Sequence, residues 1–364
     1  LTANLIQFTF PYLLFVSLTS LFASVLNTWG RFAVPAFTPA LLNISFILSA
    51  FYLTPFFDPP IMALGLAILL GGIAQLCFQI PFLIRLNLWP KFRWKPSDPG
   101  VLQILRKMAP AVLGVSAAQI SLVINTNLAS RMQVGSVSWL TYADRLMELP
   151  VGLLGVAMAT VILPALSVSV AKNKAEDYQA TLQWGLITML VVSLPSVAGL
   201  VVLSEPILMT LFMRDQFSLL DVSMTQVAFW GYGIGLVPIV MIKLLAPVFY
   251  ANKDTKTPVR IAMGAIFFTQ ILNFIFWMVL PADIKHAGLA MAISGGAWLN
   301  AVALVIKLRS RGLFVDNNKW LLVLRDSVFA TLLMSIVIFF AAREVDWLLQ
   351  GDCELIVFID AVVK

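Results

Sequence analysis

Long apolar runs separated by short polar loops follow one another along almost the whole chain. A helix needs about 20 apolar residues to cross a bilayer. Membrane β-strands would instead alternate apolar and polar residues over about ten positions, and these runs do not alternate. The pattern therefore predicts ten membrane-spanning helices, at about 3–27, 36–57, 61–84, 104–129, 142–171, 181–204, 223–250, 259–280, 286–306 and 320–342.

The composition strengthens this prediction. Hydrophobic residues make up 60% of the 364 residues and charged residues only 12%, whereas soluble domains hold about 45–50% apolar and roughly 25% charged residues. A water-soluble fold cannot bury such an excess, because its surface must grow with its volume. We therefore expect an all-α integral membrane protein, built as a polytopic helical bundle.

The basic residues are distributed unevenly between the predicted loops. Seventeen fall in one set of alternate loops and only four in the other. Basic loops stay on the cytoplasmic side of a membrane. The first predicted span therefore enters from outside and the tenth exits to the outside. This topology explains the net charge of +6 without a nucleic-acid partner.

An internal repeat is visible in the predicted spans. Three features recur at an offset of 223 or 224 residues, in equivalent topological positions. They are Gly65-Leu66-Ala67 with Gly288-Leu289-Ala290, Gly71-Gly72 with Gly295-Gly296, and Pro35 with Pro258. The first three spans therefore look like a copy of the seventh to ninth, in the same orientation.

The repeat predicts how the chain is divided. We expect residues 1–95 to form the second half of an N-terminal lobe with three helices, 96–315 a C-terminal lobe with six, and 316–364 an additional helix and a truncated tail. Two parallel repeats are typical of transporters whose lobes face a central cavity. If the fourth to sixth spans open the second copy, roughly three further helices should precede residue 1.

The clearest candidate site is a charged group at the outer start of the fifth predicted span. Asp144 and Glu148 lie four residues apart on one helix face, with Arg145 beside them. Charges within a membrane cost about 2.5–3.5 kcal/mol each unless they are paired or hydrated. A planar guanidinium suits bidentate binding of phosphate. The alternative is a solvated helix start, whose acids complement the helix dipole while Arg145 reaches the headgroups.

Other polar residues within spans are weaker candidates. Lys243 either lines a cavity as a second substrate-binding cation or extends its side chain to the cytoplasmic surface. Asn125, Gln270 and Asn273 could coordinate a monovalent ion, although hydrogen bonding between helices is the commoner use of such residues.

The motifs of common enzymes are absent from the sequence. It has no P-loop, no zinc-protease motif and no serine-hydrolase elbow. The single His286 and the distant Cys77 and Cys353 lack the spacing of metal ligands. We expect transport of a molecule rather than its chemical conversion, with no metal and no cofactor.

Several strings then point to one family. They are Leu26–Phe32, Pro35–Phe37, Leu42–Ile44, Gly114–Ile120, Val137–Trp139, Tyr142–Pro150, Leu245–Tyr250 and Lys256–Val259. Through them the chain resembles, from about residue 5 to 330, the MurJ (MviN) family of bacterial lipid II flippases. The resemblance implies a 14-helix fold of the multidrug/oligosaccharidyl-lipid/polysaccharide exporter superfamily, of which this chain lacks the first three helices and the last.

The resemblance also implies a function. The family moves lipid II, the undecaprenyl-pyrophosphate-linked peptidoglycan precursor, from the cytoplasmic to the periplasmic leaflet of the bacterial inner membrane by alternating access. Arg145 falls on a position that this family requires, with Asp144 and Glu148 beside it. The resemblance implies lipid II, membrane lipids and the cell-wall synthesis machinery as partners.

The driving force implied by the family is a monovalent ion or the membrane potential. Some relatives bind sodium through acidic residues on helices that correspond to the fourth and eighth spans. This chain departs from that pattern, because Asn125, Gln270 and Asn273 are amides without a carboxylate.

Two alternative functions remain open at this point. The first is a drug/cation antiporter of the same fold. The second is a membrane enzyme or scaffold in the metabolism of lipid-linked precursors.

Overall fold

The fold is built from helices. The computed structural model describes residues 2–88, 98–156, 162, 165–166, 168–169, 175–214, 216–252, 254–312 and 319–343. Within these ranges turns and short loops join helices, and no β-strand occurs. The all-α prediction is confirmed. The chain divides into two compact units; the described residues of the first are 2–88, and the second begins at Asp98.

Eight stretches of the described chain are long and apolar enough to cross a membrane. They confirm eight of the ten predicted spans. The helices concerned are α1 (Thr2–Thr9) with α2 (Tyr12–Thr28), α3 (Ala33–Tyr52), α4 (Ile61–Arg85), α8 (Ala175–Val202), α10 (Leu219–Ala251), α11 (Lys256–Val279), α12 (Lys285–Ser310) and α13 (Lys319–Arg343). Pro11, which lacks a backbone N–H, stands where α1 gives way to α2.

The remaining two predicted spans fall on other elements. The fourth corresponds to α5 (Pro99–Ser130), a helix of 32 residues. The fifth begins in α6 (Ser136–Pro150) and continues through a π-helical turn, Val151–Val156. Residues 157–161, 163–164, 167 and 170–171 of this span lie outside the described residues. A short helix, α9 (Ser204–Phe212), links α8 to the region before α10.

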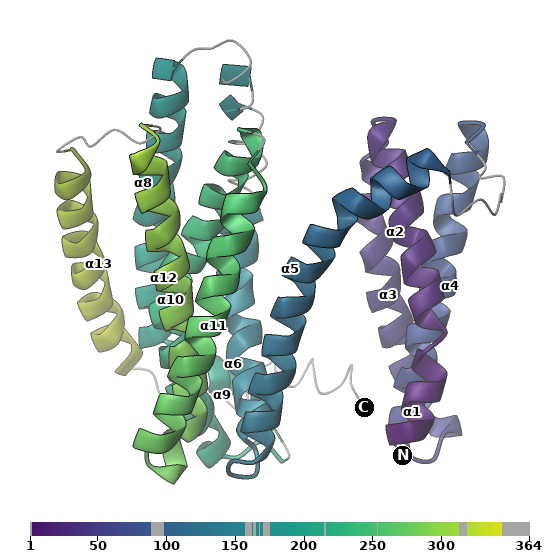
Figure 1. Ribbon diagram of the computed structural model, residues 1–364. Helices are drawn as coiled ribbons and strands as arrows, with labels where there is room; N and C mark the ends of the chain where they lie inside the picture. The colour runs from purple at the N-terminus through teal and green to yellow at the C-terminus, as the bar shows by residue number, and fades with distance from the viewer. Residues whose placement is uncertain are drawn as a thin grey trace. The chain divides into compact units, whose positions relative to one another are not determined.

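In the first unit, α4 packs against both α2 and α3 (Figure 1). Its small residues face the neighbouring helices: a Cβ on Gly71 would meet Leu42 of α3, and one on Gly72 would meet Tyr12 of α2. Backbones can approach closely where side chains are this small. The apolar core of this unit is a small cluster of Phe22, Leu26 and Leu83.

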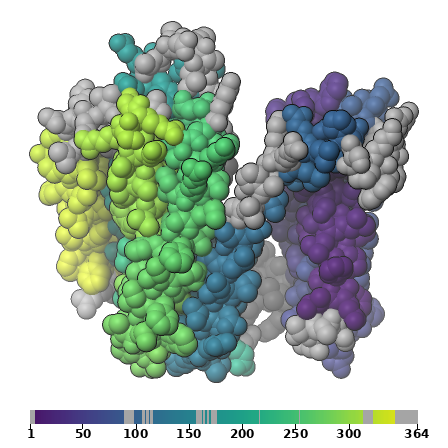
Figure 2. Space-filling view, in the orientation of Figure 1, coloured from purple at the N-terminus to yellow at the C-terminus, as the bar shows by residue number. Residues whose placement is uncertain are grey.

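In the second unit, α12 packs against both α10 and α11, and α11 and α12 lie side by side in the space-filling view (Figure 2). The helix α10 also contacts α6, α8 and α9. It therefore carries much of a large core cluster, whose bulkiest fully buried members include Phe229, Phe249, Leu236 and Leu244.

Large apolar side chains remain on the outside of the helices. Phe267 of α11 and Phe329 and Phe340 of α13 are all exposed. Water would penalise such a surface, whereas acyl chains accept it. The exposed apolar surface agrees with the predicted placement of these helices in lipid.

Candidate functional site

The charged group predicted from the sequence lies on α6, and the start of α6 is fixed by local contacts. Gly135, the residue before the helix, has a φ of 102°, which glycine adopts without strain. A Cβ at Gly135 would lie 2.6 Å from the ring of Trp139. The indole nitrogen of Trp139 donates a hydrogen bond of 2.8 Å to Asp221 Oδ1 at the start of α10. These contacts fix the orientation of α6, and with it the direction of the helix face that carries Asp144 and Glu148.

Arg145 pairs with only one of its neighbouring carboxylates. Its Nη1 donates to Glu148 Oε2 at 3.2 Å, and the two side chains are 72% and 66% exposed. Such an exposed ion pair contributes little stability. The pair therefore orients Arg145 weakly, and within the described residues its other guanidinium N–H groups remain available to a ligand.

Arg145, Asp144 and Glu148 line one cavity of about 350 Å³. Its walls come from α5, α6, α10 and α12 of the second unit. Its polar lining consists of Asn125, Thr126, Thr141, Asp144, Arg145, Glu148 and Tyr232. The structure therefore brings Asn125 of α5 to the same cavity as the charged group of α6.

A second, smaller cavity adjoins the same residues. It measures about 160 Å³ and shares Asp144, Glu148, Tyr232 and Ile293 with the larger one. The rest of its lining is apolar, from Met147, Val151, Leu236 and Ile239. The two cavities thus meet at the carboxylates and Tyr232.

Lys243 lines neither cavity. It lies four, seven and eleven residues beyond Ile239, Leu236 and Tyr232, on the same face of α10. Eleven residues correspond to about 16 Å along a helix. Its aliphatic stem packs on the π-helical turn, where a Cβ on Gly155 would lie 2.9 Å from Lys243 Cγ. Its role as a substrate-binding residue stays a prediction.

The three amides predicted as ion ligands meet between α5 and α11. Asn273 Nδ2 donates to Asn125 Oδ1 at 2.7 Å and to Gln270 Oε1 at 3.1 Å. Gln270 Nε2 donates to Ser121 Oγ at 2.7 Å and to Asn125 Oδ1 at 3.4 Å. Asn125 Oδ1 thus faces amide donors, which is the arrangement of a helix-helix contact. Ion binding by this cluster stays a prediction.

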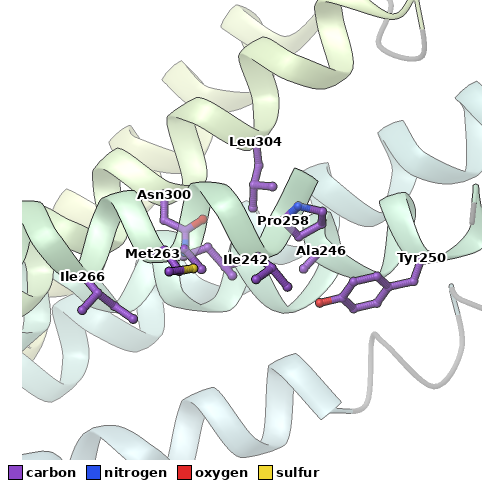
Figure 3. A pocket seen from close by; sticks show the side chains of 10 residues that line it. Ile242, Ala246, Tyr250, Pro258, Met263, Ile266, Asn300 and Leu304 are labelled. Carbon is purple, nitrogen blue, oxygen red and sulfur yellow. The ribbon is translucent and has the colours of Figure 1, made fainter. Parts of the chain in front are cut away.

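No group of three or more His, Cys, Asp or Glu side chains that could hold a metal ion occurs in the part of the chain that the structure describes. A third cavity, of about 200 Å³, lies between α10, α11 and α12 and is largely apolar. In Figure 3, Tyr250 and Ile266 lie at its opposite ends, with Ile242 and Met263 between them. Its lining contains no charged residue, so it offers no cation to a phosphate.

Sequence reasoning missed Tyr232, which lines both cavities at the charged group. It lies 84 residues beyond Glu148, and only the packing of α10 on α6 brings them together. One signal was present: Gly231 and Gly233 flank it, and small residues in a span mark a close helix contact.

Comparisons with known proteins agree with one another. A family model described as "Lipid II flippase MurJ" matches residues 1–357. A lipid II flippase MurJ of Burkholderia cenocepacia is 42% identical over 351 residues, which are 95% of this chain and 67% of that protein. A probable lipid II flippase MurJ of Vibrio cholerae is 42% identical over 320 residues, which are 88% of this chain and 60% of that protein. The chain thus spans three fifths to two thirds of these relatives.

Two solved structures share the fold. One, of a lipid II flippase MurJ in an inward closed conformation, has a TM-score of 0.71 and 24% identity, and the match covers 93% of this chain and 72% of that one. The other, an inward-facing multidrug resistance MATE family transporter of the MOP superfamily, has a TM-score of 0.67 and 14% identity, over 85% of this chain and 71% of that one. At these identities the likeness concerns the fold.

Proposed function

The chain belongs to the lipid II flippase MurJ family, and from that premise we propose that it moves lipid II from the cytoplasmic to the periplasmic leaflet. It is a multi-pass protein of the bacterial inner membrane. The chain spans only 60–67% of the length of the two relatives described above. The activity of the whole protein is therefore a proposal for this chain.

The observation that carries the proposal is the position of Arg145. It is the only arginine in the lining of the 350 Å³ cavity, and one exposed contact with Glu148 leaves most of its N–H groups available. A guanidinium binds phosphate oxygens in a bidentate manner. The cavity is of the size that ligand sites occupy, about 300–1,000 Å³. In the proposed mechanism Arg145 holds the pyrophosphate while the polyprenyl tail stays in lipid.

The proposed driving force is the membrane potential. Moving one charge through 100 mV is worth about 2.3 kcal/mol, and a pyrophosphate carries more than one charge. The amide cluster around Asn273 contains no carboxylate, and its side chains already donate hydrogen bonds to one another. Coupling to a monovalent ion at this cluster stays the alternative, and so does an interaction with the cell-wall synthesis machinery.

Replacing Arg145 tests the proposal. The intact protein and its Arg145→Ala variant would be reconstituted in vesicles, and the rate at which fluorescent lipid II reaches the opposite leaflet would be measured. We expect a fall of about tenfold or more, because charged hydrogen bonds are worth about 1.5–3 kcal/mol. Arg131→Ala is the matched control, because Arg131 is an exposed arginine at the end of α5 that lines no described cavity.

Equal rates for the Arg145→Ala variant and the Arg131→Ala control would remove Arg145 from the mechanism.

A second candidate function, a drug/cation antiporter, is favoured by the acidic excess of the α6 group. Uptake of a cationic dye that lipid II does not inhibit would support it over lipid II transport. Conversion of lipid II into a new covalent product would instead support a membrane enzyme.

A further inference from the structure

We infer that Asp144, Glu148 and Tyr232 form a subsite for an alkylammonium group on the transported headgroup, next to the phosphate-binding position of Arg145. The inference deepens the proposed function and rests on it. It concerns the place where the two cavities of the second unit meet.

The first observation is the charge balance of the site. Asp144 and Glu148 supply two negative charges and Arg145 one positive charge, all in the lining of one cavity. Lys243, the next cation along this face of α10, lines neither cavity. The group therefore keeps one net negative charge where a pyrophosphate is proposed to bind. Since like charges repel more strongly away from bulk water, the surplus carboxylate needs a cation when the phosphate is present.

The second observation is Tyr232. Its side chain is 8% exposed, and it lines both cavities beside the two carboxylates. Within the described residues no hydrogen bond of its hydroxyl group is found. A largely buried polar side chain that lines a cavity and makes no hydrogen bond with the described residues is available to a ligand or to water. The phenol oxygen and the two carboxylates together offer three acceptor groups.

The chemistry of the acceptors matches a primary ammonium group. Such a group presents three N–H donors and accepts none, and an aromatic ring further stabilises a nearby cation. The smaller cavity is otherwise lined by Met147, Val151, Leu236 and Ile239. This apolar lining suits the alkyl chain that carries the amine, whereas a bare metal ion prefers oxygen ligands on all sides. The occupant is therefore an alkylammonium on the headgroup, and a free cation is the competing outcome.

The test uses two forms of lipid II. In one, a side chain of the peptide ends in a primary amine; in the other, that amine is acetylated. Dissociation constants for both would be measured with the intact protein in detergent. We expect the amine form to bind about tenfold more tightly, which corresponds to about 1.4 kcal/mol. In the Asp144→Asn/Glu148→Gln variant the ratio should fall to about one, and binding of the acetylated form should persist, which also shows that the variant is folded.

Two further variants sharpen the test. Tyr232→Phe keeps the ring and removes the hydroxyl, so the ratio should fall only partly. Thr141→Val changes another residue of the larger cavity that lies outside the subsite, and its ratio should match that of the parent.

Equal affinity of the parent for both lipids, or an unchanged ratio in the double variant, would overturn the inference. Equal binding of both forms that strengthens as sodium replaces potassium at constant ionic strength would place a free cation in the subsite and overturn the inference too. If both forms bind equally but Arg145→Ala weakens both, only the subsite fails. If neither form binds the parent, the proposed function fails.

Discussion

The groups α2–α4 and α10–α12 place the third helix against the other two in the same way. One glycine at a helix contact in each group, Gly71 and Gly235, shows how the contacts differ, although the two positions are not equivalent in the repeat. In the first group, a Cβ on Gly71 would lie 2.5 Å from Leu42 Cδ1, the movable end of a side chain, and 3.2 Å from Leu42 Cα. In the second, a Cβ on Gly235 would lie 2.8 Å from Ser294 Cα. Ser294 Oγ in turn donates to the carbonyl of Gly231 at 2.6 Å.

Burial separates the two groups further. The core cluster of the group α2–α4 contains Phe22, Leu26 and Leu83. In the other group, α10 packs on α6, α8 and α12 within a much larger cluster. Buried amides hold the first group together: Gln75 Nε2 donates to the Thr38 carbonyl at 3.2 Å, and Gln79 Nε2 to Thr38 Oγ1 at 3.0 Å. A repeated sequence thus reproduces the contact between helices, whereas burial depends on which further helices surround the group.

Glycine substitutions should separate the two groups most strongly. Gly235→Ala would force α10 and α12 apart, because the new methyl group meets backbone, and it should cost about 3 kcal/mol. Gly71→Ala should cost about 1 kcal/mol, because the end of Leu42 can move. Thermal unfolding of the purified protein in detergent would measure both. Gly264→Ala is the control, because its Cβ would meet nothing within 4 Å, and it should be neutral or slightly stabilising. Equal losses at Gly235 and Gly71 would contradict the comparison.

Substitutions of buried amide side chains should cause the next largest losses of stability. Asn273→Leu removes the donor to Asn125 Oδ1 and to Gln270 Oε1 and should cost about 1–2 kcal/mol. Gln79→Leu removes a single hydrogen bond, to Thr38, and should cost about 0.6 kcal/mol, a typical value for one such bond in a membrane protein. Denaturant unfolding in micelles would rank the two. A larger loss for Gln79→Leu would show that the small core of the first unit depends more on its amides than we infer.

The smallest effect should appear at the helix starts. Asp254 accepts hydrogen bonds from the backbone N–H groups of Lys256 and Thr257, at 3.1 and 3.0 Å, and from Arg311 Nη2 at 2.6 Å. The hydrogen bonds from Thr257 and then Arg311 lower the pKa of Asp254. Arg31 occupies the equivalent position before α3, 223 residues earlier, and α3 has no side-chain cap.

Because the folded-state pKa of Asp254 is depressed, its stabilisation is present above the unfolded value of about 3.9 and is lost as the pH falls toward the lower folded value. Asp254→Asn keeps a capping side chain but loses the charge, and should cost about 0.2–0.5 kcal/mol at pH 7. The difference in unfolding temperature between parent and variant should shrink from pH 6 to pH 3. A difference that stays constant would show that the charge contributes nothing.

The sequence predicted the parts of the fold that length and hydropathy determine. Eight of the ten spans were found because a membrane helix needs a long apolar run, whatever its neighbours. The break at Pro11 and the π-helical turn after Pro150 were missed, because a proline in an apolar run permits a kink, a break or a continuous helix. Which of these forms depends on neighbouring helices that an apolar run does not specify.

The candidate site, like the fold, could be predicted from the sequence only in part. Asp144, Arg145 and Glu148 could be grouped from spacing alone, because residues three and four apart share a helix face. Spacing did not show that only Glu148 pairs with Arg145 within the described chain. Nor did it show that Tyr232 joins the carboxylates or that Lys243 lines neither cavity, since both depend on how α10 packs against α6.

The π-helical turn at Val151–Val156 marks a place where the chain length can change inside a helix. A π-helical turn holds one residue more than an α-helical turn, so a single deletion there leaves an uninterrupted α-helix. Because the turn absorbs the extra residue, the residues after it keep about the same orientation, whereas a deletion within a regular α-helix rotates them by about 100°. We expect a deletion at this turn to be tolerated when it leaves a small residue against the stem of Lys243, where Gly155 now lies.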